Sequence, residues 1–535
     1  MAKIYLAEIT ARDPAAAADQ VLRFSSGRGY NHASAPGFYE PRLLQPANAG
    51  RSVFGDGRTV GAASLNIGAI EVANLGQLDH LTAWAFGREA RILAGEEGGA
   101  YGSFVVLLSG TVEQPSAEWG ALTFRFRDKL EALDRPLSAT LFAGNNALPN
   151  GVEGTAEDLL GLPKPVLYGE ADNFSPPLVN TAKLIFQIAD KPISAIRGVW
   201  DGGVPLTAGA VRANFAALLN TTAPTAGRFD WYFGPEGSFI RLGSNTAREV
   251  TVSADEGATS AARTAGQLWR RILAERAGVA AGLIDNAAVA ALDTKAPGPV
   301  GLWIGTDEVS IAEILSAIGS SVGAWFAHSL AGVWTLGRIE APAGPPAARF
   351  RRLSLGSAAQ AGEGDIVSLE WLPTNDDGRG VPSSSVRLAW GRNFTVQEDR
   401  ALGGDKTSGS DPVGGLARRQ WLKSEWRYAV SLAPAAVLSL YPGAKPIEFE
   451  SLLRTQAAAQ AEADRRRDLY AARQLRFRVG IRLGPSAAPA LELGSVVRLE
   501  IPRFGLGAGV LFLVIGTDYD AAKDAAVLDL WGILP

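Results

Sequence analysis

The C-terminal stretch, Gln474 to Pro535, constrains the fold of this chain more than any other part of the sequence. At its start, apolar residues at positions 475, 477, 479, 481 and 483 alternate with Arg476, Arg478, Gly480 and Arg482. A period of two indicates a β-strand with one apolar face and one basic face. Positions 497, 499 and 501 repeat the pattern, and 511–515 is a continuous apolar run, which is typical of a strand covered on both faces. We therefore expect a compact antiparallel β-module here.

The whole chain is too long for one hydrophobic core. A length of 535 residues predicts several domains, and a hydrophobic content of 47% provides each with apolar side chains for a core. The 61 glycines and 30 prolines are spread along the sequence, which favours many strands joined by turns. The expected fold is mainly β with α+β insertions, in a multidomain arrangement.

Changes in pattern divide the sequence into five consecutive parts. We expect an N-terminal β domain over 1–135, a β-rich domain over 136–255, an α+β domain over 256–345, a mixed domain over 346–473 that ends in a long helix, and the C-terminal β module over 474–535.

The α+β part has the clearest helix signals. Apolar residues at 265, 268, 269, 272 and 273 follow the spacing of an amphipathic helix. Ser310 with Glu313 three residues later forms a capping box at the start of a second helix. The segment after that helix predicts a hairpin that turns near Ser329 to Gly332.

The long helix of the mixed part is expected over Glu450 to Arg473. Glu462 and Arg466 lie four residues apart within it, a spacing at which opposite charges support a helix. The run from Arg465 to Arg467 is interpreted as a solvated face of this helix.

Composition excludes several kinds of chemistry. The chain has no cysteine, so disulfides, thiolate metal sites and a cysteine nucleophile are excluded, and its three histidines are far apart in the sequence. A net charge of −4 argues against a protein that binds nucleic acid through phosphate contacts. The N-terminal residues do not have the pattern of a signal peptide, and no apolar run is long enough to span a membrane.

The motifs that suggest enzymes or ligand sites are weak. Gly319-Ser-Ser-Val-Gly323 matches the nucleophile motif of hydrolases, but it follows a helix, so we interpret it as a helix end. The glycines at 505, 507 and 509 precede a strand and not a helix, which favours a turn over a phosphate loop. The aspartates at 518, 520 and 524 lack the rest of a calcium loop. Two acidic pairs, at 96–97 and 376–377, are neighbours in sequence, whereas glycosidase carboxylates face each other across a gap.

Three stretches of the sequence resemble parts of known proteins. The segment 298–342, a helix followed by a hairpin that ends in a Gly-Arg-Ile strand, is similar to a stretch of tailed-phage baseplate and tail-tip hub proteins. The C-terminal stretch resembles the last module of such hubs in Leu493-Gly494 with Val496, Val497 and Leu499, in Pro502 to Leu506 with Ile515, Gly516 and Asp518, and in Leu528 with Leu530 to Gly532. Ser495 stands where the family commonly has Asp. The segment 28–74 also resembles the start of these proteins in siphophages and in gene transfer agents.

The resemblance implies a structural, non-enzymatic virion protein without cofactor or metal. It implies a homotrimeric hub in which tandem tail-tube-like β-barrel domains continue the tail tube around a lumen for DNA passage. The implied partners are the distal tail protein and the central fibre or tail-tip protein, with the tape-measure protein as a further candidate. The implied location is the phage tail tip, after synthesis in the cytoplasm of the bacterial host.

The basic face of Arg476, Arg478 and Arg482 has two interpretations, a contact with acidic residues of a neighbouring protomer or a solvated surface. Two other functions remain open. One is a receptor- or glycan-binding tail-tip protein that uses the aromatic stretches at 26–50 or 225–240, and the other is a tail-associated cell-wall hydrolase.

Overall fold

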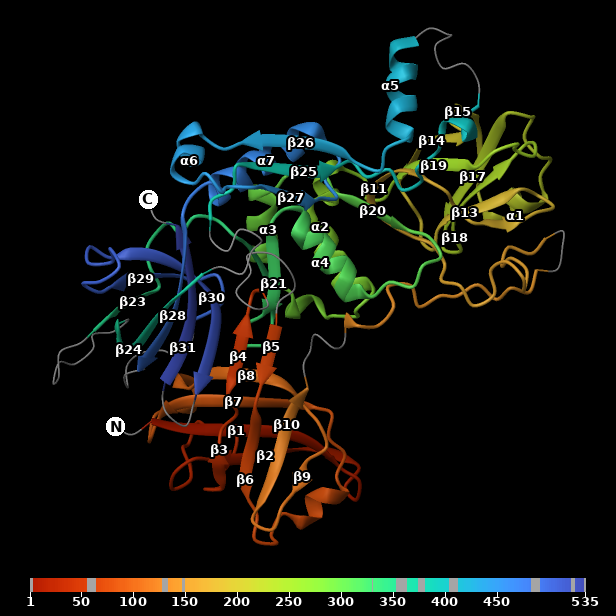
Figure 1. The fold of residues 1–535 in the computed structure, drawn as a ribbon. Helices are drawn as coiled ribbons and strands as arrows, with labels where there is room; N and C mark the ends of the chain where they lie inside the picture. Colours follow the sequence, from red (N-terminus) through yellow and green to blue (C-terminus); the bar gives the residue numbers. More distant parts are fainter. Residues whose placement is uncertain are drawn as a thin grey trace.

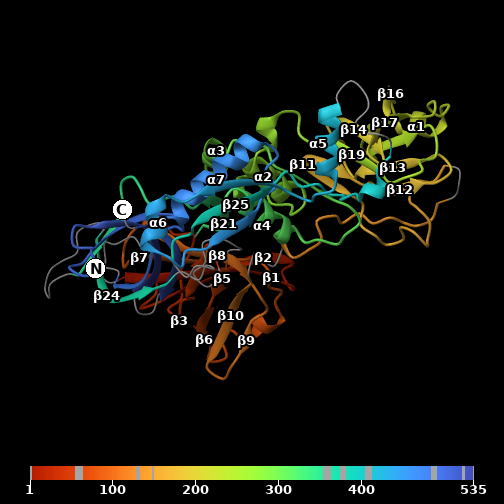
Figure 2. The same cartoon turned by 45° about the horizontal axis from the view of Figure 1, so that its top comes forward.

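The computed structural model describes residues 3–54, 64–127, 133–146, 150–329, 331–352, 363–373, 381–403, 412–482, 491–520 and 525–533. Strands make up 42% of the chain and helices 18%, so the mainly β, multidomain fold expected from the sequence is confirmed. Figures 1 and 2 show an N-terminal β domain, a barrel beside it, and a body of helices and sheets that extends away from both.

The N-terminal domain is one large sheet whose strands are antiparallel neighbours. Its order is β2-β1-β7-β8-β10-β6-β3, and β9 pairs with β10. The strands are β1 (Lys3–Asp13), β2 (Ala18–Ser25), β3 (Leu43–Gln45), β6 (Ala69–Ala73), β7 (Glu89–Glu96), β8 (Val105–Val112), β9 (Ser116–Ala117) and β10 (Ala121–Arg127).

The C-terminal strands close into a six-stranded barrel. The ring runs β29-β23-β24-β28-β31-β30 and closes because β30 also pairs with β29. Its members are β23 (Ala348–Arg351), β24 (Glu363–Leu372), β28 (Gln474–Arg482), β29 (Val496–Glu500), β30 (Val510–Asp520) and β31 (Ala525–Ile533). The four strands after residue 473 pair antiparallel as expected, whereas β23 lies parallel to both of its neighbours.

The sequence pattern of the barrel strands matches their burial. Phe477 and Val479 on β28 lie inside the barrel, and Arg478 between them is exposed. On β30, Phe512 and Val514 belong to the barrel core, while Leu513 and Ile515 pack in a second apolar cluster outside it. The continuous apolar run of β30 is therefore covered on both faces, as its composition indicates.

A hairpin of the N-terminal domain extends the barrel sheet. It consists of β4 (Ala49–Ser52) and β5 (Ser64–Ile67), and β4 pairs antiparallel with the second half of β30. We call this hairpin the arm. The hydrophobic core of the N-terminal sheet is also continuous with that of the barrel, through residues such as Tyr5 and Tyr519, whose hydroxyls lie 3.2 Å apart. Sheets therefore combine residues from opposite ends of the chain, and the division into five consecutive parts remains a proposal.

The body begins with two five-stranded sheets, ordered β15-β14-β19-β11-β20 and β12-β13-β18-β17-β16. The strands of the first are β11 (Val166–Phe174), β14 (Ala195–Asp201), β15 (Val204–Pro205), β19 (Val250–Asp255) and β20 (Gly301–Ile304). Those of the second are β12 (Leu178–Asn180), β13 (Ile185–Ala189), β16 (Thr207–Val211), β17 (Arg228–Gly234) and β18 (Gly237–Leu242), with the short helix α1 (Phe215–Asn220) beside them.

Three helices and a hairpin form the centre of the body. They are α2 (Ala265–Glu275), α3 (Asn286–Lys295), α4 (Ile311–Ser321), β21 (Ala324–His328) and β22 (Trp334–Arg338). All five apolar positions predicted for α2 are buried, and the capping box of Ser310 and Glu313 begins α4. The hairpin and both of these helices are confirmed.

The last part of the body is a three-stranded sheet, β26-β25-β27, that packs against a long helix. Its elements are β25 (Ser385–Trp390), α5 (Pro412–Leu422), β26 (Arg427–Leu432), α6 (Ala435–Leu440), β27 (Pro446–Glu450) and α7 (Gln456–Tyr470). The expected start of the long helix at Glu450 is wrong, because Glu450 ends β27 and the helix begins after Thr455, whose side chain accepts a hydrogen bond from the Ala458 amide.

Candidate functional site

Arg51 on β4 joins three parts of the molecule. Its buried guanidinium donates hydrogen bonds to the carbonyl of His328 at 3.1 Å, the carboxylate of Glu492 at 2.8 Å and the carbonyl of Leu491 at 3.2 Å. His328 ends β21 in the body, and the other two residues precede β29 of the barrel. One side chain of the arm therefore binds both the body and the barrel.

Apolar contacts complete this joint. Val53 and Phe54 follow β4 and are almost fully buried, in a cluster with Trp325 of the body and Ile515 and Trp531 of the barrel. Fully burying a side chain of this size contributes about 1.5–3 kcal/mol. The arm is thus held by packing as well as by Arg51.

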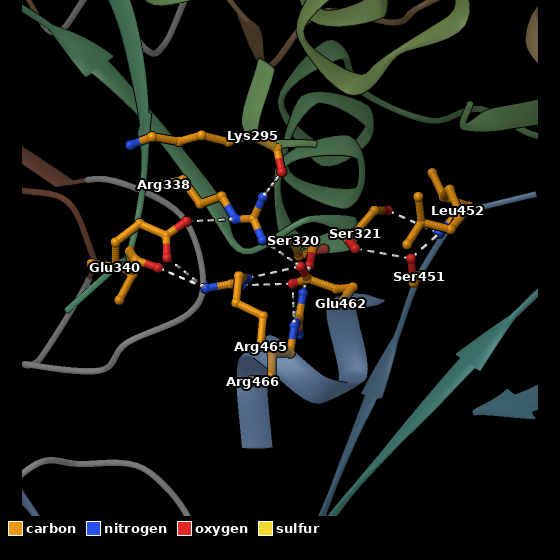
Figure 3. Close-up of polar contacts among 12 residues, drawn as sticks. Lys295, Ser320, Ser321, Arg338, Glu340, Ser451, Leu452, Glu462, Arg465 and Arg466 are labelled. Atoms are coloured by element: carbon orange, nitrogen blue, oxygen red, sulfur yellow. Dashed lines mark hydrogen bonds and ion pairs between the residues drawn. The ribbon is translucent and has the colours of Figure 1, made fainter. Parts of the chain in front are cut away.

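A second joint is centred on the carboxylate of Glu462 on α7 (Figure 3). Three guanidinium groups contact it, those of Arg338 at 2.9 Å, Arg465 at 2.6 Å and Arg466 at 2.6 Å. Glu340 lies 3.1 Å from Arg338 and 3.9 Å from Arg465. A cluster of three cations and two carboxylates therefore links α7 to β22.

Backbone carbonyls accept the remaining guanidinium hydrogen bonds of this cluster. Arg466 donates to Ser320 near the end of α4, Arg465 donates to Ile339 at 2.7 Å, and Arg338 donates to Lys295 at the end of α3 at 2.5 Å. The carbonyls at a helix C-terminus carry partial negative charge, which favours cations there. Figure 3 shows these groups converging between α7 and the end of α4.

The cluster lies where the chain enters the barrel. Ile339 and Glu340 follow β22 and lead toward β23, and α7 leads directly into β28. Arg465 lies on α7 and contacts both Ile339 and Glu340. This joint therefore ties the two connections to each other beside the barrel.

The charge of Glu462 is stabilised by its surroundings. Burial by itself would raise the pKa of this carboxyl, but the positive charges of Arg466, Arg465 and Arg338 outweigh burial and lower the pKa to about 2. The carboxylate is therefore ionised in the folded protein at neutral pH.

The interpretation of Arg465 to Arg467 as a solvated face is wrong for two of the three residues. Arg466 is almost fully buried and Arg465 is largely buried, because both turn toward Glu462, whereas Arg467 pairs with Asp468 at the surface. The expected pair of Glu462 and Arg466 is confirmed.

The three arginines proposed for a protomer interface differ in their surroundings. Arg476 is buried and lies 3.1 Å from Asp529, Arg478 is about half exposed and also lies 3.1 Å from Asp529, and Arg482 is exposed at the end of β28. The structure brings the first two together on one carboxylate, and it does not bring Arg482 to them. Whether this face binds a neighbouring protomer remains a proposal.

An open pocket of about 690 Å³ lies beside Arg478, where the arm meets the barrel. Gly50, Gly68 and Gly516 contribute to its wall, with Arg478 and Val527 beside them. A Cβ added to Gly68 would lie 3.1 Å from the Asn48 backbone, and one added to Gly516 would lie 3.0 Å from the Asp529 side chain, so these two glycines allow close packing of the wall. Asp518 and Asp529 also line the pocket, which therefore contains both signs of charge.

The weak motifs of the sequence have structural roles in the part of the chain that the structure describes. Ser321 of the hydrolase-like motif ends α4, and its hydroxyl donates to the Ala317 carbonyl and accepts from the Leu452 amide. The glycines at 505, 507 and 509 form a turn that leads into β30. Asp518 and Asp520 lie on β30, while Asp524 and the pair at 376–377 are outside the described residues. Within the described ranges, no group of three His, Asp or Glu side chains is placed to hold a metal ion.

The aromatic stretches proposed for receptor binding are largely interior. Tyr30 and Tyr39 are buried and pack edge to face, although Phe38 is 55% exposed. The stretch at 225–240 forms most of the hairpin of β17 and β18, in which Phe229 and Phe239 are buried. Most of these rings therefore serve packing.

Comparison with solved structures finds similar chains, and three of them are described here. A tail protein from Neisseria meningitidis MC58 is 10% identical with a TM-score of 0.36, over 98% of this chain and 96% of that one. The 43 kDa tail protein of prophage MuSo2 from Shewanella oneidensis is 8% identical with a TM-score of 0.38, over 99% and 98%. A chain of the virion of a native gene transfer agent is 15% identical with a TM-score of 0.36, over 70% and 85%.

No protein-family model matches the sequence, and no curated protein does. None of the helices that the structure describes is long and apolar enough to cross a membrane.

Proposed function

We propose that this chain is the structural hub of a phage tail tip or baseplate. Three copies form a ring that continues the tail tube, joins the distal tail protein to the central fibre or tip protein, and leaves a lumen for DNA. The tape-measure protein is a further candidate partner.

One observation carries this proposal. The N-terminal sheet and the C-terminal barrel lie side by side and share a continuous hydrophobic core, with the arm as a second connection. Each chain therefore presents two β units in a fixed arrangement. A ring of six β units around a tube is built from three such chains.

The motif residues that resemble hub proteins are compatible with this role, because those described have structural positions in the barrel. Leu493 packs in the cluster with Trp325 and Trp531, and Leu530 lies in the barrel core. Gly494 has a φ of +82°, and a Cβ added there would lie 2.6 Å from the Trp325 ring, so only glycine fits.

The net charge of −4 also suits a protein whose lumen DNA must traverse. Few cationic contacts mean weak binding to phosphates, so DNA would slide past without being retained.

The test is to locate the protein in assembled particles. An epitope tag at the C-terminus, labelled with gold-conjugated antibody, is expected to mark one end of each tail in electron micrographs. Labelling along the whole tail shaft, or on the capsid, would contradict a hub. Particles without the tag serve as the control for antibody specificity.

A further inference from the structure

Four side chains at one end of the barrel form a row of two aromatic rings between two cations. The ring centroids of Trp371 on β24 and Phe504 lie 6.1 Å apart. The guanidinium of Arg473 lies 5.5 Å from the centroid of the Trp371 ring. That of Arg503 lies 5.0 Å from the centroid of the Phe504 ring. Arg473 directly precedes β28, and Arg503 and Phe504 lie between β29 and β30. We call these four residues the row.

The row is accessible from solvent. Trp371 is 49% exposed, Phe504 is 42% exposed, and both arginines are exposed. The two rings therefore present apolar surface directly beside two positive charges. Tryptophan and arginine are among the residue types that are enriched at the energetic centres of protein–protein interfaces.

The rings of the row are anchored in the barrel core. Trp371 lies opposite Phe477 of β28, which is fully buried, so both side chains lie on the face of the sheet that points into the barrel. The Phe504 ring lies 5.9 Å from the Phe477 ring, and Phe477 packs edge to face on Phe512. Aromatic contacts thus lead from the core to the surface. Because these rings are already held in place, binding a partner costs little conformational entropy.

The turn that carries Phe504 has a backbone conformation that phenylalanine rarely adopts. It is closed by a hydrogen bond from the Leu506 amide to the Arg503 carbonyl at 3.0 Å. Its two central residues, Phe504 and Gly505, have φ values of +56° and +78°. Positive φ at both positions defines a type I′ turn, where Asn, Asp or Gly is preferred at the first position. A bulky side chain there costs conformational free energy. Since the ring remains 42% exposed, burial accounts for only part of its presence.

The two guanidinium groups of the row have no carboxylate partner among the residues that the structure describes. The acidic side chains nearest in sequence are engaged elsewhere. Glu370 of β24 lies opposite Arg478, on the outer face of the barrel. Glu500 binds Arg349 at 2.5 Å and Arg498 at 3.0 Å. The row therefore carries two positive charges that no neighbouring carboxylate neutralises within the described part of the chain.

Other arginines that lie over rings show which group would complete the row. The guanidinium of Arg387 lies 3.5 Å from the centroid of the Tyr428 ring and binds Glu448 at 3.4 Å. Arg392 lies over two aromatic rings and binds Glu425 at 3.1 Å. A ring that covers one face of a guanidinium leaves the N–H groups at its edge free to bind a carboxylate. In the row the ring is present and the carboxylate is not.

We propose that the row binds an acidic segment of a partner protein, in which carboxylates lie on both sides of an apolar side chain. Arg473 and Arg503 donate hydrogen bonds to the carboxylates. The apolar side chain packs against Trp371 and Phe504. A nucleic acid fits less well, because its bases need open ring faces to stack on, and an arginine already covers one face of each ring. This interaction surface goes beyond the proposed function and does not depend on the formation of a ring of chains.

Peptide binding to the purified full chain tests this site. The probe is a dye-labelled peptide of sequence Gly-Ser-Glu-Glu-Leu-Phe-Glu-Glu-Ser-Gly, and its control has Gln in place of every Glu. Fluorescence polarisation at low salt measures the affinity of each peptide. The acidic peptide is expected to bind at least tenfold more tightly than its control, and its binding should weaken as sodium chloride is added.

Two double variants separate the row from the charge of the whole chain. Arg473→Gln with Arg503→Gln is expected to weaken binding of the acidic peptide at least tenfold. Arg387→Gln with Arg392→Gln removes the same amount of charge from arginines that lie over rings and already bind glutamate, so it should change the affinity less than twofold. Trp371→Ala should weaken binding at least tenfold as well. Because the arginines of the row are exposed, the first double variant is expected to fold, and circular dichroism checks this.

Several results would overturn the inference. They are equal binding of the acidic peptide and its Gln control, equal losses of affinity in the two double variants, and no binding of the acidic peptide up to its solubility limit. A short oligothymidylate tests the other class of partner. If it binds the wild-type chain more tightly than the acidic peptide and loses this affinity in Arg473→Gln with Arg503→Gln, the row binds nucleic acid and the inference is wrong. None of these measurements depends on the number of chains in the particle, so failure here leaves the hub proposal intact.

Discussion

The guanidinium of Arg51 lies 2.8 Å from the carboxylate of Glu492, although 441 residues separate them in the sequence. This ion pair connects the arm of the N-terminal domain to the loop before β29 of the barrel. Arg51 also donates hydrogen bonds to the carbonyls of His328 and Leu491. A residue near the start of the chain therefore helps to hold the barrel, which is built mostly from the end of the chain.

Replacing Arg51 with methionine is expected to lower the free energy of unfolding by about 2–4 kcal/mol, because buried charge-assisted hydrogen bonds to two carbonyls and a carboxylate are lost. Urea denaturation followed by tryptophan fluorescence would measure this. The control is Arg12→Met, which removes an exposed pair with Asp19 and should change stability by at most about 1 kcal/mol. Equal effects of the two changes would argue against Arg51 as a joint.

Replacing Glu462 with glutamine leaves three guanidinium groups near an uncharged side chain. Breaking a buried ion pair on one side costs about 3–5 kcal/mol, since the remaining charges stay buried without compensation. Thermal unfolding of the variant should show a lower midpoint than wild type. Glu340→Gln provides a comparison in the same cluster. Because the Glu340 carboxylate is 34% exposed, this change should lower the unfolding midpoint by less.

Acid should weaken the same joint. The folded-state pKa of Glu462 is about 2, below its ordinary value of 4.5, so its ionised form stabilises the fold above pH 4.5. This stabilisation is lost as pH falls from about 4.5 to about 2, by an amount on the order of 3 kcal/mol. The expected observation is that wild type loses its stability advantage over Glu462→Gln across this window. A constant difference between the two proteins down to pH 2 would contradict the lowered pKa.

Gly169 on β11 is expected to tolerate no side chain. Its φ is +69°, and a Cβ there would lie 2.1 Å from the carbonyl oxygen of Val300 on the neighbouring segment. Gly169→Ala should therefore destabilise the body by more than the roughly 1 kcal/mol that the backbone conformation alone costs. Gly161→Ala separates the two effects, because Gly161 has a φ of +76° but no atom within 4 Å of the added Cβ. Chemical denaturation of both variants is the measurement, and equal losses would exclude the steric effect.

Much of the local structure could be predicted from the sequence. The alternation in β28, the doubly covered run in β30, the apolar spacing of α2 and the capping box of α4 each depend on residues close in the chain. Such patterns determine which face of a helix or strand is buried, and they do so independently of the element that packs against that face.

The arrangement of the joints could not be predicted in this way. The pairing of β4 with β30 and the contact of Arg51 with Glu492 join segments more than 400 residues apart. A strand as short as Ala49–Ser52 has no sequence pattern from which its partner strand could be predicted. The burial of Arg466 depends in the same way on Ser320, which is distant in sequence. The exposure of Trp119 could not be predicted either, because other tryptophans of the chain, such as Trp269 and Trp325, are buried in the core.

The most direct test of the hub proposal is the mass and shape of the purified chain, measured by light scattering and negative-stain electron microscopy. The account predicts a particle of three chains that forms a closed three-fold ring with a central hole wide enough for duplex DNA. A compact monomer that persists at all concentrations, with no ring in the images, would contradict it.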